Sequence, residues 1–275
     1  MRDRKDGYLI RDIDPMHFIM PLIYPNRCDN EAYISERLDL TAINAWLEKE
    51  NAKPENAEFK YTLFHVLVAC MMKTVHLRPK MNRFIANDTM YQRKNITAAF
   101  VVKKIFSDNG AEGLAILDCK EDDTIYTLHQ KLYDQISSVR SDKLDASSDA
   151  MDVFNKLPRF ISRPVVKFIC FLDKHGWVPM SLIKTDPYYS TVLFSNVGSL
   201  GMKCGYHHLT NWGTNSIFCL IGKIEDNHVD IGLTIDERLA DGYYYSKTIK
   251  LIKYLSEYPE LLEHELKEVV DYESH

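Results

Sequence analysis

Residues that can move protons gather in the stretch TIDERLADG, Thr234 to Gly242. Glu237 and Asp241 supply carboxylates, Arg238 supplies a cation, and Gly242 closes the stretch. The preceding residues, HVDIGLTID, alternate like a strand, and Tyr245, Ile249 and Ile252 after it share one face at helical spacing. The stretch is therefore predicted to be a strand-to-helix loop, where a sheet commonly displays its chemistry.

A second group of polar residues follows another β-branched run, TVLFSNVGSLG, which ends in Ser195, Asn196 and a glycine turn. A few residues later, CGYHHLTNWGTNSIF carries His207, His208 and Trp212. A serine hydroxyl can stabilise an oxyanion, and an imidazole can accept a proton. Neighbouring side chains on extended backbone point to opposite faces, so at most one of the two histidines enters a given pocket. In the alternative, both satisfy hydrogen bonds at a subunit contact.

Strands and helices that alternate along the chain must position these groups, which predicts an α/β fold. The expected helices are 39–49, with Asp39 or Thr41 as its cap, the apolar and buried 61–77, which stops before Pro79, and 124–139, capped by Thr124. ITAAFVVKK and GLAILDC form a predicted hairpin around the turn signal Ser107–Gly110, and 216–224 is a further strand. In HVDIGLTID the odd-numbered Val229, Ile231, Leu233 and Ile235 face one way and the polar or small residues between them the other, which predicts a half-buried strand.

Composition limits the class of protein. The chain has 275 residues, 45% of them apolar, a net charge of -5 and a pI near 6.1, which together favour a soluble cytoplasmic protein and argue against a nucleic-acid binder. The six cysteines lack metal or redox spacing, and no metal is expected, although His207, His208 and Glu237 remain a conceivable metal site. Ser141–Ala150 is expected to be a surface loop, and the acidic tail from Pro259 to Glu273 a solvated helix face.

The stretch from Leu157 to Lys184 is apolar with interleaved cations, Arg159, Arg163, Lys167 and Lys174 among them. A basic amphipathic helix can lie on an anionic membrane, but such side chains also extend from ordinary packed helices into water. We expect no membrane attachment and keep it as an alternative.

Four landmarks in order carry a resemblance to a known family. They are YISERLDLTAI, an early strand leading into a helix; HLRPKMNRFIANDTMYQRKNITAAFVV, a turn, hairpin and strand; FSNVGSLG; and TIDERLADG. Over nearly the whole chain the pattern resembles the chloramphenicol acetyltransferases and the catalytic domain of the dihydrolipoamide acyltransferases of 2-oxo acid dehydrogenase complexes. The family's loop reads His, three residues, Asp, Gly. Here Glu237 stands at the histidine position.

The resemblance implies a two-layer α/β sandwich, a homotrimer, and active sites between subunits that coenzyme A and the acyl acceptor enter from opposite sides. Residues 1–275 then form one acyltransferase-like catalytic domain, with no lipoyl or subunit-binding domain. Carried over residue by residue, Ser195 stabilises the oxyanion and Asp241 orders the loop through an arginine, either Arg11 or Arg27. Arg238, Asn196, Gly242 and Trp212 are the expected substrate contacts.

The sequence leaves the identity of the catalytic base open. A free carboxyl group titrates near 4.3 and an imidazole near 6.5, so Glu237 is the weaker base unless burial raises its pKa. In the first interpretation the chain is a CoA-dependent acyltransferase with a small hydroxyl, amine or thiol acceptor, and its base is Glu237, His207 or His208. In the alternative, the chain is a catalytically silent trimer that binds a ligand or partner.

Overall fold

The chain is described here from a computed structural model, which covers residues 2–103, 112–140 and 158–274. Its main elements are β1 (Gly7–Leu9), α1 (Pro15–Ile23), β2 (Glu31–Asp39), α2 (Thr41–Asn51), α3 (Leu63–Leu77), β3 (Arg83–Ala86), β4 (Thr89–Arg93), β5 (Ile96–Lys103), β6 (Glu112–Cys119), α4 (Ile125–Arg140), α6 (Arg159–Lys174), α7 (Met180–Thr185), β7 (Val192–Asn196), β8 (Ile217–Glu225), β9 (His228–Asp236) and α8 (Gly242–Glu257). The expected turn Ser107–Gly110 and loop Ser141–Ala150 lie outside the described residues.

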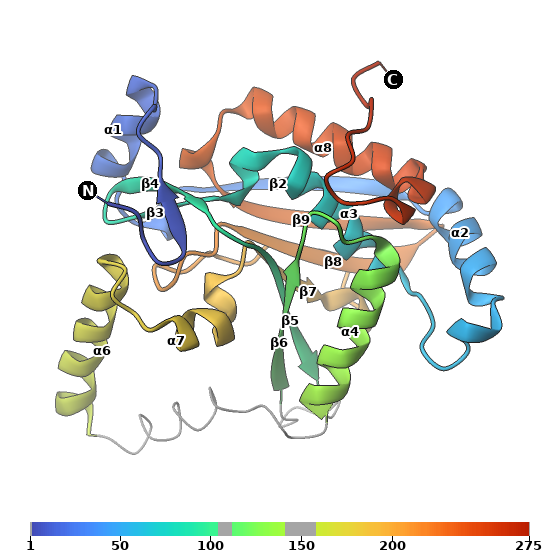
Figure 1. Cartoon of the computed structure of the whole chain (residues 1–275), viewed down its shortest axis with the longest axis horizontal. Helices are drawn as coiled ribbons and strands as arrows, with labels where there is room; N and C mark the ends of the chain where they lie inside the picture. Colours follow the sequence, from blue (N-terminus) through green and yellow to red (C-terminus); the bar gives the residue numbers. More distant parts are fainter. Residues whose placement is uncertain (1, 104–111, 141–157, 275) are drawn as a thin grey trace.

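A six-stranded sheet in the order β2-β9-β8-β7-β5-β6 forms one layer. β7 runs parallel to β5 and to β8, whereas the other neighbours are antiparallel, so the sheet is mixed. Side chains of α2, α3, α4 and α8 share one hydrophobic core with this sheet and form the second layer (Figure 1). The predicted two-layer α/β sandwich is confirmed. A smaller sheet, β1-β4-β3, lies beside it.

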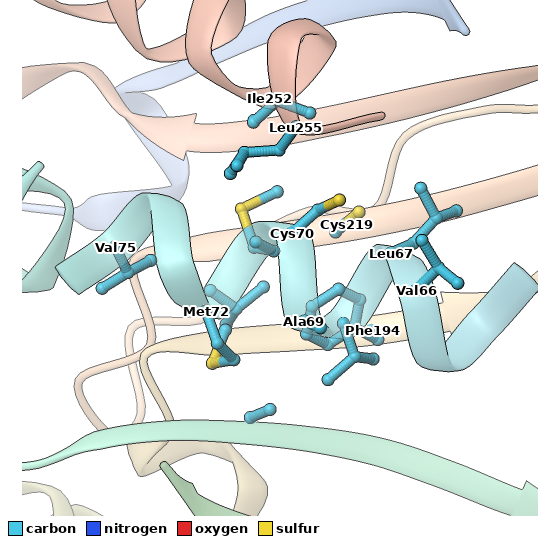
Figure 2. Close-up of a cluster of buried hydrophobic side chains, with 14 of the residues drawn as sticks. Val66, Leu67, Ala69, Cys70, Met72, Val75, Phe194, Cys219, Ile252 and Leu255 are labelled. Carbon is cyan, nitrogen blue, oxygen red and sulfur yellow. The ribbon is translucent and has the colours of Figure 1, made fainter. Parts of the chain in front are cut away.

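Helix α3 is the centre of the core. Every residue from His65 to Val75 is buried, as the apolar sequence of this helix predicts. Figure 2 shows α3 between Ile252 and Leu255 of α8 on one side and Phe194 of β7 on the other. The helix ends at Leu77, before Pro79, as expected.

Strand β9 is more buried than its alternation predicts. Its four apolar side chains enter the core, but Gly232, Thr234 and Asp236 on the other face are buried as well. The chain after β7 returns across that face: the Lys223 amide donates to the carbonyls of Met202 and Lys203. The prediction of a half-buried strand is wrong because this segment replaces solvent.

Two glycines make the close crossing possible. A Cβ added to Gly222 would lie 1.8 Å from the Lys203 carbonyl oxygen, and one added to Gly232 would lie 2.1 Å from the Gly205 carbonyl oxygen. Both contacts are with backbone, which cannot move aside as a flexible side chain can. Glycine is therefore required here for close approach.

Replacing Gly222 by alanine is expected to lower the free energy of unfolding by about 2 kcal/mol or more, because the crossing segment must shift. Urea unfolding followed by circular dichroism measures the change. Gly242→Ala is the matched control, since a Cβ there meets nothing within 4 Å. Equal stability of the Gly222→Ala chain and the wild type would contradict the close crossing.

The acidic tail is a packed segment rather than a solvated helix face. After a short 3₁₀ turn, Pro259–Glu263, the chain runs without regular structure, and Leu262, Leu266 and Tyr272 are buried. The Lys73 ammonium of α3 donates to the Glu265 carbonyl at 2.8 Å. Buried apolar side chains between the charged residues therefore pack this tail against α3.

Candidate active site

The loop after β9 has the predicted strand-to-helix form, and each end is capped by an aspartate. Asp236 accepts from the Arg238 amide, and Asp241 accepts from the Tyr244 amide at 2.7 Å, which starts α8. The Glu237 amide donates to the Asn30 carbonyl of the neighbouring chain segment. Glu237 itself is thereby fixed by its backbone while its side chain stays exposed.

A buried ion pair between Arg238 and Asp236 stabilises this loop. The Arg238 guanidinium donates to both carboxylate oxygens of Asp236, Nε to Oδ1 at 2.8 Å and Nη2 to Oδ2 at 2.6 Å, and Nη1 donates to the Tyr24 carbonyl. Arg238 and Asp236 are 1% and 0% exposed, so removing one partner would leave the other as an unpaired buried charge. Arg238, expected to contact substrate, is thus engaged within the fold.

Arg27 joins the same buried group. Its Nε lies 3.8 Å from Asp236 Oδ2, and its Nη atoms donate to the carbonyls of Thr210, Ile85 and Gly213. Burial lowers the pKa of Arg27, and the charge of Asp236 opposes that shift. Arg27, one of the two arginines considered as the partner of Asp241, lies beside Asp236 instead, and Asp241 is a helix cap. Arg11, the other arginine considered, is exposed.

Glu237, Asp241 and Gly242 open into a hollow of about 660 Å³, here called the Glu237 hollow. Its floor comes from β2, the end of β9, the following loop and α8, and it is apolar apart from Glu36 and Ser246. The facing wall is α1. The apolar floor residues are Ala32, Ile34, Ile235, Ala240, Tyr245 and Ile249, and the wall residues are Met16, His17 and Met20.

His17 places an imidazole in the hollow where the loop lacks one. Asp14 caps α1, its Oδ1 accepting from the amides of Met16 and His17, and its Oδ2 lies 2.6 Å from His17 Nδ1. These hydrogen bonds, the His17 amide first, lower the pKa of Asp14. An ionised Asp14 accepts a hydrogen bond from Nδ1–H of the neutral ring, which leaves Nε2 as the acceptor. The His17 side chain is 15% exposed against 58% for Asp14.

Sequence reasoning missed His17, although a local signal exists. In DPMH an aspartate stands before a proline at the first helical position, and the histidine follows at the third. That spacing lets a capping side chain meet the histidine ring. Nothing in the sequence shows that the ring then lies across from Glu237.

Ser195 lies at the end of β7 in a different hollow of about 380 Å³, here called the Ser195 hollow. Phe64, Phe100 and Phe194 form apolar walls, and Asn196 lies at the rim, where its side chain accepts from the Ser199 amide. His65 also lines it, with Nδ1 engaged by Thr62. Burial lowers the pKa of His65 to about 3, so its ring is neutral at pH 7.

The two histidines considered as replacements lie elsewhere. His207 bonds the His208 carbonyl through Nδ1 and stacks on Phe218 with ring centres 4.2 Å apart, and His208 bonds the Leu209 carbonyl. Trp212 donates to Asp186 at 2.7 Å. The residues that line the Glu237 and Ser195 hollows include none of the three.

Residues 2–103, 112–140 and 158–274 hold no group of three or more His, Cys, Asp or Glu side chains placed to hold a metal ion. In those same ranges, each helix is too short or too polar to cross a membrane.

The arrangement of strands and helices also occurs in solved structures. A probable dihydrolipoamide acetyltransferase from Listeria monocytogenes 4b F2365 matches with a TM-score of 0.59 and 13% identity, covering 90% of this chain and 94% of that one. A chloramphenicol acetyltransferase matches with a TM-score of 0.53 and 13% identity, covering 90% and 98%. The chain has the chloramphenicol acetyltransferase fold. The expectation drawn from the four landmarks is confirmed at the level of fold.

A further structure with the chloramphenicol acetyltransferase fold bears on catalysis. The dihydrolipoamide acetyltransferase of Azotobacter vinelandii matches with a TM-score of 0.58 and 14% identity, covering 92% of this chain and 94% of that one. That structure comes from a study of the roles of a serine, a histidine and an asparagine in its catalytic mechanism. No protein-family model and no curated protein matches the sequence.

Proposed function

We propose that the chain is a single catalytic domain that transfers an acyl group from acyl-CoA to a small hydroxyl, amine or thiol acceptor. One observation carries the proposal. In a fold shared with acetyltransferases, Ser195 and the Glu237 loop open into two separate hollows of one chain, each with its own apolar walls. A homotrimer in which the Ser195 hollow of one copy meets the Glu237 hollow of the next makes one complete site from the two.

His17 is the base in this proposal. Its Nε2 takes the proton of the acceptor as the acceptor's oxygen, nitrogen or sulfur adds to the thioester carbon, and Asp14 holds the ring in the required tautomer. Ser195 of the neighbouring copy donates a hydrogen bond to the oxyanion that forms. When the carbon–sulfur bond breaks, His17 returns the proton to the departing thiolate. Coenzyme A supplies the activated acyl group as its thioester.

Glu237 and Asp241 then act through their charge. Both line the hollow that His17 enters, and a nearby anion favours the charged form of an imidazole. Glu237 thereby stabilises the imidazolium of the transition state without taking the proton itself. The same carboxylate would oppose an oxyanion in its own hollow, which is why the oxyanion donor belongs on the neighbouring copy.

Turnover separates this function from a silent trimer that only binds a ligand. The purified chain is incubated with acetyl-CoA and longer acyl-CoAs and a panel of alcohols, amines and thiols, and acylated product is detected by mass spectrometry. Light scattering gives the oligomer mass, expected at three times 32.0 kDa. Calorimetric binding of acyl-CoA without turnover supports the silent trimer. A lone 32.0 kDa subunit, or no binding of any acyl-CoA, removes the proposal.

A further inference from the structure

Helix α6, Arg159–Lys174, exposes apolar side chains that no described segment covers. Phe160, Phe168 and Phe171 are 77%, 60% and 47% exposed, and Trp177 just beyond the helix is 50% exposed. The ring centres of Phe171 and Trp177 lie 5.8 Å apart, so the aromatic surface continues past the end of the helix. Figure 1 shows α6 at the edge of the molecule, away from the main sheet.

A cationic side runs along the same helix. Arg159, Arg163, Lys167 and Lys174 are exposed and recur at intervals of four, four and seven residues, which places them on one side. Asp173 is the one acidic residue of the helix, and it is buried, accepting from the Tyr189 hydroxyl and the Gly213 amide. The exposed surface of α6 therefore consists of an aromatic face beside a basic one.

The helix is attached to the molecule mainly through its C-terminal end. Half-buried Val165, Ile169 and Leu172 share the inner side, and the Arg4 guanidinium donates to the Asp173 carbonyl at 2.9 Å. The aromatic and basic faces are therefore presented by a helix whose C-terminal turn is fixed. At about 1.5 Å per residue, its 16 residues extend about 24 Å along a surface.

We propose that α6 and Trp177 dock the protein on the surface of an anionic lipid membrane. A helix with an aromatic face and a cationic face lies in the plane of the headgroups, its rings in the acyl boundary and its cations among lipid phosphates. Charge complementarity favours this occupant over a second copy of the same face, since two such faces would bring like charges together. The proposal does not depend on acyl transfer.

The test is sedimentation of the whole protein with vesicles of phosphatidylcholine alone and with one quarter phosphatidylglycerol, at low and at physiological salt. Binding to the anionic vesicles is expected, and salt is expected to weaken it. The triple variant Arg159→Gln, Arg163→Gln, Lys167→Gln is expected to bind about 100-fold more weakly, since each cation near an anionic surface favours binding severalfold. Phe160→Ser with Phe168→Ser is expected to abolish binding.

The charge-matched control is the triple variant Lys247→Gln, Lys250→Gln, Lys253→Gln on α8, which is expected to bind like the wild type. Circular dichroism and light scattering confirm the fold and the oligomer mass of each variant. Absence of binding to anionic vesicles, or an equal loss in the α8 control, overturns the proposal. The proposal is also overturned if the wild type does not bind vesicles and the phenylalanine variant has a different oligomer mass. That result identifies the aromatic face as a contact between copies.

Discussion

Mixed trimers that contain both Ser195→Ala and His17→Gln chains are expected to recover about a third of the wild-type acyl-transfer rate. Each variant alone is expected to lose about 10²-fold or more, the first through loss of an oxyanion donor and the second through loss of the base. Ser195 and His17 line different hollows of one chain, so a site that uses both draws them from two copies. A trimer that holds both variants has both intact residues at one of its three interfaces, which gives about a third of the wild-type rate.

The two variants are co-expressed with different affinity tags, the mixed species is isolated through both tags, and its rate is compared with that of each parent. The control mixes Ser195→Ala with the double variant Ser195→Ala, His17→Gln, which leaves every interface without a serine. Recovery in the isolated mixture and none in the control is the expected pattern. If mixed oligomers form but stay as slow as their parents, Ser195 and His17 do not share a site across two copies.

Short-range patterns were enough to predict several helices and strands of this fold. An apolar run of helical length predicted α3, and paired β-branched runs predicted the β5–β6 hairpin, whose register begins at Ile96 and Cys119. The alternating strand followed by helical spacing predicted the loop at Glu237. Each of these depends on residues within about twenty positions of one another, where periodicity and capping decide the structure.

Contacts between distant residues account for the wrong predictions. The burial of both faces of β9 depends on a segment that returns over Gly222 and Gly232, and alternation within the strand cannot reveal that covering layer. The partner of Arg27 could not be predicted for the same reason: Asp236 and Asp241 are close in sequence, and their burial decides which one needs a cation.

His17 lies 220 positions before Glu237, so no motif could connect them, whereas His207 lies near the serine strand and drew attention by its position. The rings of His207 and His208 are used by carbonyls of their own segment and by Phe218. The role of a buried or stacked histidine follows from the groups that lie next to it. The role of a histidine that lines a hollow can be recognised only when the position of its helix in the fold is known.

His17→Gln is expected to lower kcat by about 10²–10⁴-fold while the KM for acyl-CoA changes little, because the imidazole acts on the proton of the acceptor and not on binding of the thioester. Asp14→Asn is expected to lower kcat as well, since an amide no longer requires the proton on Nδ1. The matched control is His228→Gln, which changes a half-buried histidine that bonds the Asp226 carbonyl. Initial rates across pH 4.5 to 9 measure all three.

The acid limb of the pH–rate profile decides between the two candidate bases. Free imidazoles titrate near pH 6.5 and free carboxyl groups near 4.3, so the position of the acid limb distinguishes an imidazole base from a carboxylate base. Glu237→Gln removes one anion from the hollow that His17 lines, and activity is expected to fall but to persist, because the imidazole still takes the proton. If Glu237 were the base, the same change would abolish the limb together with the activity. Full activity in His17→Gln together with complete loss of activity in Glu237→Gln would exclude His17 as the base.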